Sequence, residues 1–430
     1  MKLFYLVFFL SFLVLGIPIV FVMLLAPGLD LFLHGQTNFF NMLIQRWVGG
    51  IDSFPLMALP FFILAGDFMA AGGVTMRIVR FAESLIGHLR AGLAHVCVLS
   101  SVMLAGGSGS AVADASALGS MLIPAMNKLN YPRSFSAAVV ASAGILAPII
   151  PPSGIMIIYA FIQNVSVAAM FAGGIIPGLI MAGGMMLVIM LKSRGGLFPD
   201  PKPRANIQEV WISFRRAMLP LGTPVILLGG ILGGLMTPTE AAGIAAAYSL
   251  LLGLLYTREI KLADLPRLFS GAALASAKIL LLVGAAVAFA SIVSLRQTPQ
   301  MVGSALVSVT DNPYLLFLII NIFLLLVGCV MDAGPAILIL APILAPVITK
   351  LGIDPIHFAV VMCINLTIGL ITPPVGLVLF VMSGISHQGL DSLTKGIIPL
   401  LISNITTLML ITFFPGLVLW IPRLTGLYAP

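Results

Sequence analysis

Two pairs of adjacent prolines stand inside long apolar segments, at Pro151–Pro152 and Pro373–Pro374. Proline has no backbone N–H and its ring clashes with the preceding turn, so a regular helix does not continue through either pair. Carbonyl oxygens of the preceding turn then lose their partners and become free to bind a cation. Each restarted helix directs the positive end of its dipole at the same region, which suits a carboxylate.

Two short polar segments, "GGSGSAVAD" from Gly106 to Asp114 and "GCVMDAGPA" from Gly328 to Ala336, add hydroxyls and carboxylates. Carboxylates within membrane segments are functional candidates by default. We expect one cation site at Ser108, Gly109, Ser110, Pro151, Pro152 and Ser153, and a second at Asp332, Ala333, Thr372, Pro373 and Gly376. We expect an anionic substrate to contact Ser110, Asp114, Ser153, Asn365 and Thr372.

Some of these residues have a structural alternative. Asp114 could instead hold its segment together by accepting backbone N–H bonds, and the small residues at 108–110 could simply permit close helix packing. Lys278 lies within an apolar run, where we expect it to extend to the membrane surface or to pair with an acid such as Glu240. Glu240 is expected near a helix start that Thr237 or Thr239 caps.

An internal repeat relates the two sets of candidate residues. An offset of 222 residues aligns Gly106–Gly154 with Gly328–Gly376 without a gap, and the double proline recurs. Each copy begins with an apolar arm of about 13 residues, Leu93–Ala105 or Leu315–Val327, which is too short to span a membrane. A polar tip and a second apolar arm follow, so we predict a re-entrant helical hairpin and then a helix broken at the prolines.

Composition places these elements in a membrane. The 430 residues are 60% hydrophobic and only 8% charged, whereas soluble domains contain about 25% charged residues. Apolar runs long enough to span recur along the chain, and their lack of alternation excludes a β-barrel. The first run, Leu3–Leu25, lacks a cleavage site and is predicted to be one spanning helix. The fold class is therefore an all-α polytopic membrane protein.

Loop charges predict the topology. If the first hairpin opens to the cytoplasm, most of the 21 Lys and Arg residues lie in cytoplasmic loops, and both termini are periplasmic. An odd number of crossings then separates the hairpins, so the repeats are inverted, which is the architecture of secondary transporters. Two amphipathic segments, Gly73–Arg90 and Pro299–Asn312, are expected to lie along opposite membrane surfaces as arms that brace a moving core.

We predict seven regions. The outer frame, or scaffold, comprises the N-terminal spanning helices (1–72) and the helices with the central cytoplasmic loop (166–297). The arms are a cytoplasmic helix (73–91) and an outer helix (298–312), and each precedes a hairpin and broken helix of the transport core (92–165 and 313–386). A C-terminal spanning helix occupies 387–430.

Five segments carry a resemblance to the large membrane subunit of the tripartite ATP-independent periplasmic (TRAP) transporters, the DctM-like family. They are "DSFPLMALPFFILAGDFMAAGG" (52–73), "SGSAVADASALGSMLIPAM" (108–126), "APIIPPSGIMIIYAF" (147–161), "PTEAAGIAAAYSL" (238–250) and "GLITPPVGLVLFV" (369–381). The family's functional positions correspond to Ser108, Gly109, Ser110, Pro151, Pro152, Ser153, Asp332, Thr372, Pro373 and Pro374.

The resemblance implies a multi-pass protein of the bacterial inner membrane that is not an enzyme. It implies an elevator-type symporter that takes up an organic acid, such as a dicarboxylate, sialic acid or a sugar acid, with Na⁺ as coupling ion and no other cofactor. A periplasmic binding protein would deliver the substrate. A small four-helix membrane subunit is expected as a separate chain, because the first helix starts at Leu3.

Two alternatives stay open at this point. A stand-alone ion or anion antiporter could have a similar inverted-repeat design. An intramembrane aspartyl protease would also hold two buried carboxylates, for which Asp114 and Asp332 are candidates. Such a protease would not need two copies of a hairpin and a broken helix.

Overall fold

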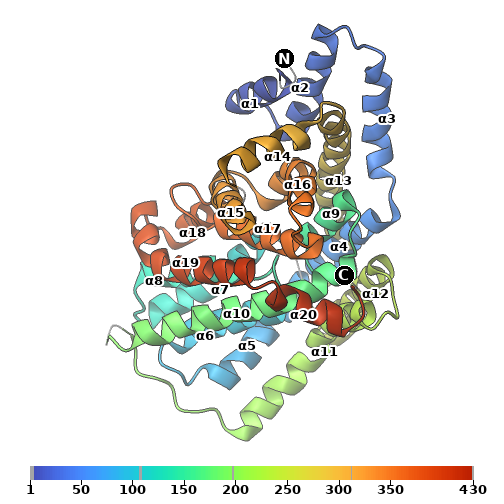
Figure 1. Cartoon of the computed structure of the whole chain (residues 1–430). Helices are drawn as coiled ribbons and strands as arrows, with labels where there is room; N and C mark the ends of the chain where they lie inside the picture. The colour runs from blue at the N-terminus through green and yellow to red at the C-terminus, as the bar shows by residue number, and fades with distance from the viewer. Residues whose placement is uncertain (1–3, 106–108, 196–197, 311, 429–430) are drawn as a thin grey trace.

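The computed structural model describes residues 4–105, 109–195, 198–310 and 312–428. All regular elements in these ranges are helices, which Figure 1 numbers α1 to α20. The all-α polytopic class predicted from the sequence is confirmed at this level. Among the described residues, eight helical segments are long and apolar enough to cross a membrane: Phe54–Ala71, Val167–Ser193, Ile207–Leu232, Pro238–Tyr256, Leu262–Leu295, Pro313–Val330, Ala333–Lys350 and Leu390–Phe413.

The structure of the N-terminal region differs from the prediction of a single spanning helix. The run Leu3–Leu25 is not one spanning helix, because the chain turns between residues 15 and 18. Gly16 has a left-handed φ of 76° and Pro18 precedes the next helix, so both residues favour a helix boundary. The four helices of this region are α1 (Phe4–Val14), α2 (Ile19–Leu33), α3 (Phe39–Ile51) and α4 (Ala58–Ala71), the last preceded by a 3-10 turn at Phe54–Met57.

The first repeat contains an arm, a hairpin and a broken helix. The elements are α5 (Val74–Ile86), α6 (Gly92–Leu104), α7 (Ala111–Lys128), α8 (Arg133–Gly144), α9 (Gly154–Gln163) and α10 (Val167–Ser193). The break between α8 and α9 contains the double proline. Three helices then lead to the second repeat: α11 (Ile207–Leu232), α12 (Pro238–Leu251, extended by a π-helical turn at Leu252–Tyr256) and α13 (Leu265–Leu295).

The second repeat has the same order of elements. They are α14 (Thr298–Val309), α15 (Pro313–Val330), α16 (Ala333–Lys350), α17 (Pro355–Gly369), α18 (Leu377–Ser386) and α19 (Leu390–Phe413), followed by α20 (Gly416–Leu424). One arm is longer than predicted: α15 has 18 residues instead of about 13. Asn312 caps α15 and Pro313 occupies its first turn, so the helix begins early, and it continues past Gly328 to Val330.

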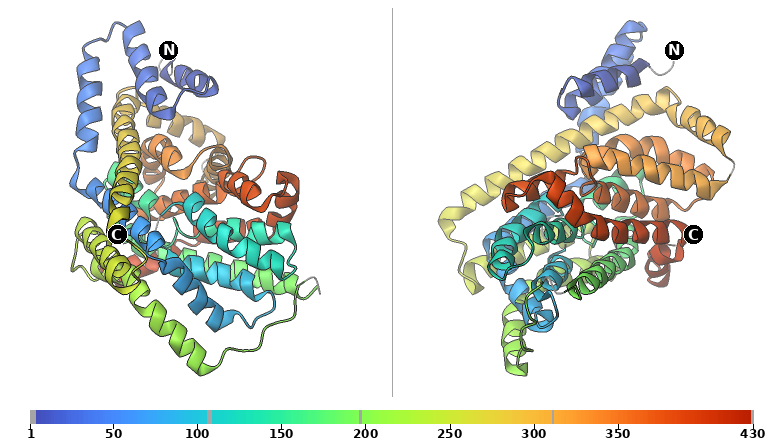
Figure 2. Two further views of the ribbon diagram at one scale, coloured as in Figure 1. Left: turned by 180° about the vertical axis from the view of Figure 1, so that it is seen from behind. Right: turned by 90° about the vertical axis from the view of Figure 1, so that its left-hand side faces the viewer.

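The helices pack as two groups, which we call the scaffold (α1–α4 and α11–α13) and the core (α6–α10 and α15–α20). In the scaffold, α4 packs along α12, and α13 contacts α2, α3 and α4. Figure 2 shows α13 as one long slanted helix beside the hairpin α15–α16. Helix α10 packs against α6, α17, α19 and α20 and therefore belongs to the core, whereas the sequence analysis assigned residues 166–297 to the scaffold.

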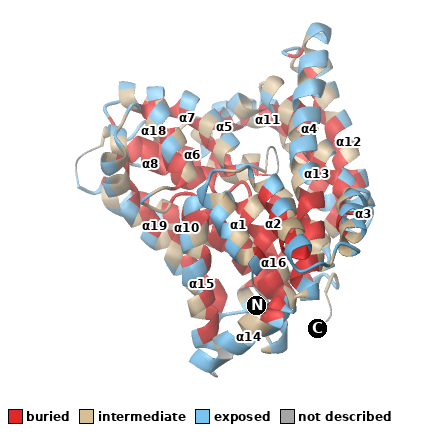
Figure 3. Cartoon of the chain, turned by 90° about the horizontal axis from the view of Figure 1, so that it is seen from above, coloured by how far each residue is buried: buried red, intermediate tan, exposed pale blue. Residues whose placement is uncertain are grey.

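Within the core, the two repeats interlock. The second hairpin arm α16 packs against α9 of the first repeat, and α7 packs against α18 of the second. Burial is densest where they meet: nearly every residue of α8 and α17 is buried, and Figure 3 shows the buried residues of α8 and α16. This arrangement brings the start of each second hairpin arm toward the centre of the molecule.

An ion pair lies near the start of each arm helix, and the first of the two joins the arm to the scaffold. On α5, Arg77 Nη1 lies 2.9 Å from Glu259 Oε1, just beyond the π-helical turn. Arg296, the C-cap of α13 just before α14, donates through Nε (2.9 Å) and Nη2 (2.5 Å) to Oδ2 of Asp30 on α2. The hydroxyls of Tyr5 and Thr298 share a further hydrogen bond of 2.5 Å beside the second pair.

The closest helix crossing in the second repeat depends on two glycines. A methyl group on Gly328 of α15 would lie 2.7 Å from the carbonyl oxygen of Leu366 on α17, and Gly369 faces Gly328 directly. We predict that Gly328→Ala separates these helices and lowers the free energy of unfolding by about 1–3 kcal/mol, the usual cost of overpacking. Thermal unfolding followed by tryptophan fluorescence measures this as a lower Tm.

Gly384→Ala is the matched control, because a methyl group on Gly384 of α18 meets no atom within 4 Å. It should leave Tm unchanged or slightly raised, since alanine favours a helix. Equal Tm values for the two variants would contradict the packing argument.

Candidate functional site

A cavity of about 290 Å³ lies between the core and the scaffold. Both hairpin tips line it, together with the first helix break and the scaffold helices α4 and α13. The polar or backbone-exposing residues that line it are Gly109, Ser110, Pro148, Pro152, Gly154, Lys278, Asp332, Ala333 and Gly334. The cavity therefore brings together parts of both predicted cation sites, 222 residues apart in the sequence.

At the first tip, Ser110 is the N-cap of α7. Its hydroxyl accepts a hydrogen bond from the Ala113 N–H at 3.4 Å, and the residue is exposed at the cavity. Gly109 has a left-handed φ of 63°, and a methyl group there would lie 3.2 Å from the backbone nitrogen of Gly154. The tip thus lies directly against the restart of the broken helix. Ser108, assigned to the same site, lies outside the described residues.

The first break is closed by Ser153, the N-cap of α9. This residue is 0% exposed, and its hydroxyl donates to the Pro148 carbonyl at 2.5 Å while accepting from the Met156 N–H at 3.4 Å. The expectation that carbonyls preceding the prolines are left without partners is therefore wrong for Pro148. Pro152 lines the cavity, whereas neither Pro151 nor Ser153 does in this conformation.

At the second tip, Asp332 is the N-cap of α16. Its Oδ1 accepts a hydrogen bond from the Ala333 N–H at 2.9 Å, and its side chain is exposed at the cavity. The first turn of α16 lines the same cavity, as does Ala111 of α7. Two helix N-termini thus meet at one cavity, and their partial positive charges favour an anion there.

The second break is bonded to its own hairpin tip. Gly376 donates its N–H to the Cys329 carbonyl at 3.0 Å, and Cys329 Sγ donates to the Thr372 carbonyl at 3.1 Å. The Thr372 hydroxyl donates to Ile368 at 2.9 Å. Thr372, Pro373 and Gly376 therefore lie next to the tip but behind the cavity wall, which Leu370 forms.

Besides Ser153 and Thr372, two more residues assigned to substrate binding lie away from the cavity lining. Asn365 is fully buried between helices, where its Nδ2 donates to the carbonyl and side-chain oxygens of Asn321 at 2.9 and 2.8 Å. Asn321 in turn donates to Thr412. Asp114 is half-buried in the first turn of α7. Of the five residues assigned to the substrate, Ser110 is the one that lines the cavity.

The suggested pairing of Lys278 with Glu240 is wrong. Lys278 projects from α13 into the cavity lining and makes no ion pair with any described residue. Glu240, its suggested partner, instead completes the cap of α12: Glu240 Oε2 accepts from the Thr237 N–H at 2.8 Å, and Thr237 Oγ1 accepts from the Glu240 N–H at 3.3 Å. The sequence feature that could have identified Lys278 as a cavity residue is its position as a cation inside an apolar run.

The described residues contain no group of three or more His, Cys, Asp or Glu side chains that could hold a metal ion. The polar oxygen-bearing side chains that line the cavity are instead those of Ser110 and Asp332. Such a set can surround a small monovalent cation, while Lys278 and the two helix N-termini offer positive charge to an anion. The cavity lining therefore carries groups of both charge types.

Sequence comparison identifies relatives over nearly the whole chain. The chain is 40% identical over 405 residues to the 2,3-diketo-L-gulonate TRAP transporter large permease protein YiaN of Escherichia coli, covering 94% of this chain and 95% of that one. It is 37% identical to the sialic acid TRAP transporter large permease protein SiaM of Vibrio cholerae, with 95% of each covered. It is 38% identical to the C4-dicarboxylate permease DctM of Pseudomonas aeruginosa, covering 87% and 88%.

A solved structure shares the fold. The YdaH transporter of Alcanivorax borkumensis superposes with a TM-score of 0.62 at 15% identity, covering 89% of each chain. The family model for the DctM component of tripartite ATP-independent periplasmic transporters matches residues 6–417. Members work with a small membrane subunit and a periplasmic binding protein, and they are multi-pass proteins of the inner membrane. The chain belongs to this family and is a large permease component of a TRAP transporter.

Proposed function

We propose that this chain couples the inward movement of sodium to the uptake of an organic acid anion, which a periplasmic binding protein delivers. The observation that carries the proposal is the cavity between the two hairpin tips, where two helix N-termini and Lys278 surround a volume of about 290 Å³. The permeases of Escherichia coli, Vibrio cholerae and Pseudomonas aeruginosa are named for carboxylic acids, which agrees with this class of substrate.

The anion is held by charges that come from different helices. The N-termini of α7 and α16 supply backbone N–H groups, and Lys278 on α13 supplies a full positive charge from the scaffold side. A small carboxylate placed among them loses little electrostatic stabilisation on leaving water. Because Lys278 belongs to the scaffold and the tips belong to the core, this arrangement is made in one position of the core.

Sodium occupies oxygen-lined sites at the two tips. The first site uses Gly109 and Ser110 with the break at 151–153, and we assign Ser108 to it as well. The second uses Asp332, Ala333, Thr372, Pro373 and Gly376. Asp332 supports the second assignment, because its carboxylate is accessible from the cavity. Sodium bound next to the cavity would offset the charge of Asp332 and so favour an anionic substrate.

Transport follows an elevator mechanism in which the core moves relative to the scaffold. The one-to-one correspondence of α5–α10 with α14–α19 supports two inverted repeats. Five crossings, those of the broken helix α8–α9 and of α10–α13, lie between the hairpins, so the second repeat has the opposite orientation. The arms α5 and α14 connect the two groups, since α5 follows α4 and α14 follows α13.

Family membership excludes the intramembrane protease, because the family consists of transporter permeases.

Reconstitution separates tripartite uptake from stand-alone antiport. We predict that proteoliposomes containing this chain and its small subunit accumulate a labelled acid only with an inward sodium gradient and the matching binding protein. Candidate substrates for the screen are succinate, sialic acid and 2,3-diketogulonate. Uptake by this chain alone would instead favour the antiporter.

Replacing single oxygen ligands should weaken sodium coupling. We predict that Ser110→Ala and Asp332→Asn each raise the sodium concentration for half-maximal uptake roughly tenfold, the equivalent of about 1.4 kcal/mol. Ser120→Ala and Asp391→Asn are matched controls, because both residues are exposed and lie away from the cavity. A sodium activation curve that is unchanged in Ser110→Ala would remove this residue from the first site.

Removing the cation of α13 should affect the substrate more than sodium. We predict that Lys278→Gln raises KM for the acid about tenfold, since the anion loses its scaffold-side charge, while the sodium curve at saturating substrate stays unchanged. Lys395→Gln, an exposed lysine of α19, serves as the control. An unaltered KM in Lys278→Gln would show that Lys278 does not contact the substrate.

A further inference from the structure

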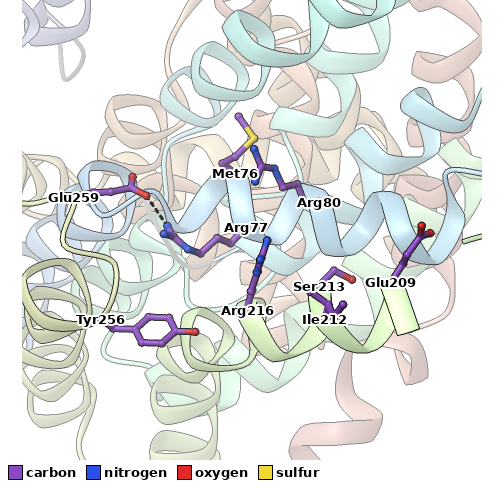
Figure 4. A pocket seen from close by; sticks show the side chains of 9 residues that line it. All are labelled: Met76, Arg77, Arg80, Glu209, Ile212, Ser213, Arg216, Tyr256 and Glu259. Carbon is purple, nitrogen blue, oxygen red and sulfur yellow. Dashed lines mark ion pairs between the residues drawn. The ribbon is translucent and has the colours of Figure 1, made fainter. Parts of the chain in front are cut away.

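A larger hollow, of about 850 Å³, lies away from the transport cavity, between α5, the first turns of α11 and the segment after α12. Three arginines and two glutamates line it: Arg77, Arg80 and Arg216 with Glu209 and Glu259 (Figure 4). No function proposed above uses these residues. Their formal charges leave the hollow with an excess of positive charge.

Both glutamates already have partners within the protein. Glu259 pairs with Arg77, which also donates to the Gly73 carbonyl at 2.9 Å. Glu209 closes the capping box of α11, where its Oε2 accepts from the Asn206 N–H at 3.2 Å. These contacts hold the two carboxylates at opposite ends of the hollow, as Figure 4 shows.

Arg80 and Arg216 have no such partner. Neither guanidinium forms an ion pair with a carboxylate of any described residue, and both side chains are exposed. Figure 4 shows Arg216 extending from α11 toward α5, which carries Arg80. A hydrogen bond of 2.7 Å between Ser84 of α5 and Ser213 of α11 holds the two helices side by side. Two arginines on facing helices are well suited to a phosphate group, which accepts paired N–H bonds.

The hollow lies at the ends of two candidate membrane spans. Its residues from α11 belong to the first turns of the candidate span Ile207–Leu232, and Tyr256 ends the candidate span Pro238–Tyr256. These two spans run in opposite directions, so both ends lie at the same membrane face. The loop charges make this the cytoplasmic face, where anionic lipids attract basic groups.

Apolar side chains favour a lipid over a soluble anion. Met76, Ile212 and Tyr256 line the hollow beside the arginines, and Ile212 is 51% exposed. Next to Ile212 and Tyr256 in the sequence, Trp211 is 62% and Leu255 is 68% exposed. Tryptophan and tyrosine are enriched where a protein meets lipid headgroups. A phosphate with attached acyl chains would satisfy both the charged and the apolar parts of this surface.

We propose that the hollow binds the headgroup of an anionic phospholipid of the phosphatidylglycerol type, with its phosphate between Arg80 and Arg216. The bound lipid joins the arm helix α5 to the scaffold helix α11. This site is independent of the transported acid and of sodium, because none of its residues lines the transport cavity.

Native mass spectrometry of the chain with its small subunit in neutral detergent tests the proposal. The probes are dioleoylphosphatidylglycerol and dioleoylphosphatidylcholine, which differ in charge but not in acyl chains. We predict tighter binding of the phosphatidylglycerol. The Arg80→Gln/Arg216→Gln double variant should weaken that binding about thirtyfold, because each surface cation contributes about a factor of five. Arg215→Gln, which removes the neighbouring charge outside the hollow, should bind like wild type.

Three further measurements make the test decisive: the lipid-free Tm, the rise in Tm on adding phosphatidylglycerol, and the displacement of bound lipid by inorganic phosphate. Lipid-free Tm values of all variants report folding, and the rise in Tm on adding phosphatidylglycerol reports binding separately from the mass spectra. Each single variant should reduce this rise, and Arg215→Gln should retain it. Undiminished phosphatidylglycerol binding in the double variant, or equal binding of phosphatidylcholine by wild type, would overturn the proposal. Displacement of the lipid by inorganic phosphate at matched concentration would instead identify a site for a soluble anion.

Discussion

Hydrocarbon offers no hydrogen bonds to a protein backbone, and this constraint governs where the helices of this chain can be interrupted. Both proline breaks lie within the core, where the first is buried and the second is partly exposed at Pro374. There the exposed carbonyls and N–H groups find partners inside the protein or face a cavity. The chain can therefore interrupt helices within its core while the freed backbone groups still find partners in the protein.

The two repeats satisfy this constraint in different ways. In the first, a side chain of the break itself supplies the missing partner, since Ser153 donates to the Pro148 carbonyl. In the second, the hairpin tip supplies it, since Cys329 bonds both to Gly376 and to the Thr372 carbonyl. The second tip and break thus form one hydrogen-bonded unit. The two ion sites that we propose are related by sequence but not equivalent in structure.

The sequence predicted most of the element order because prolines and polar tips are strong local signals. The offset of 222 residues relates the first residues of α7 and α16, and of α8 and α17, without error. Hydropathy alone did not reveal the turn at Gly16, because the apolar run continues through it, although Gly16 and Pro18 are local signals of a helix boundary. The sequence also could not predict the direction in which side chains point. Ser153 turns inward to cap a helix, Asn365 packs against Asn321, and Lys278 reaches the cavity. Those directions depend on which helices become neighbours.

The ion pairs at the two arms differ in their exposure to solvent. Asp30 and Arg296, next to α14, have side chains that are 1% and 14% exposed, whereas Arg77 and Glu259, on the α5 side, are 24% and 46% exposed. Dissolved salt screens an exposed ion pair, and it screens a buried pair much less. A rise in ionic strength therefore weakens the contact between α5 and the scaffold more than it weakens the Asp30–Arg296 pair, which lies within the scaffold just before α14.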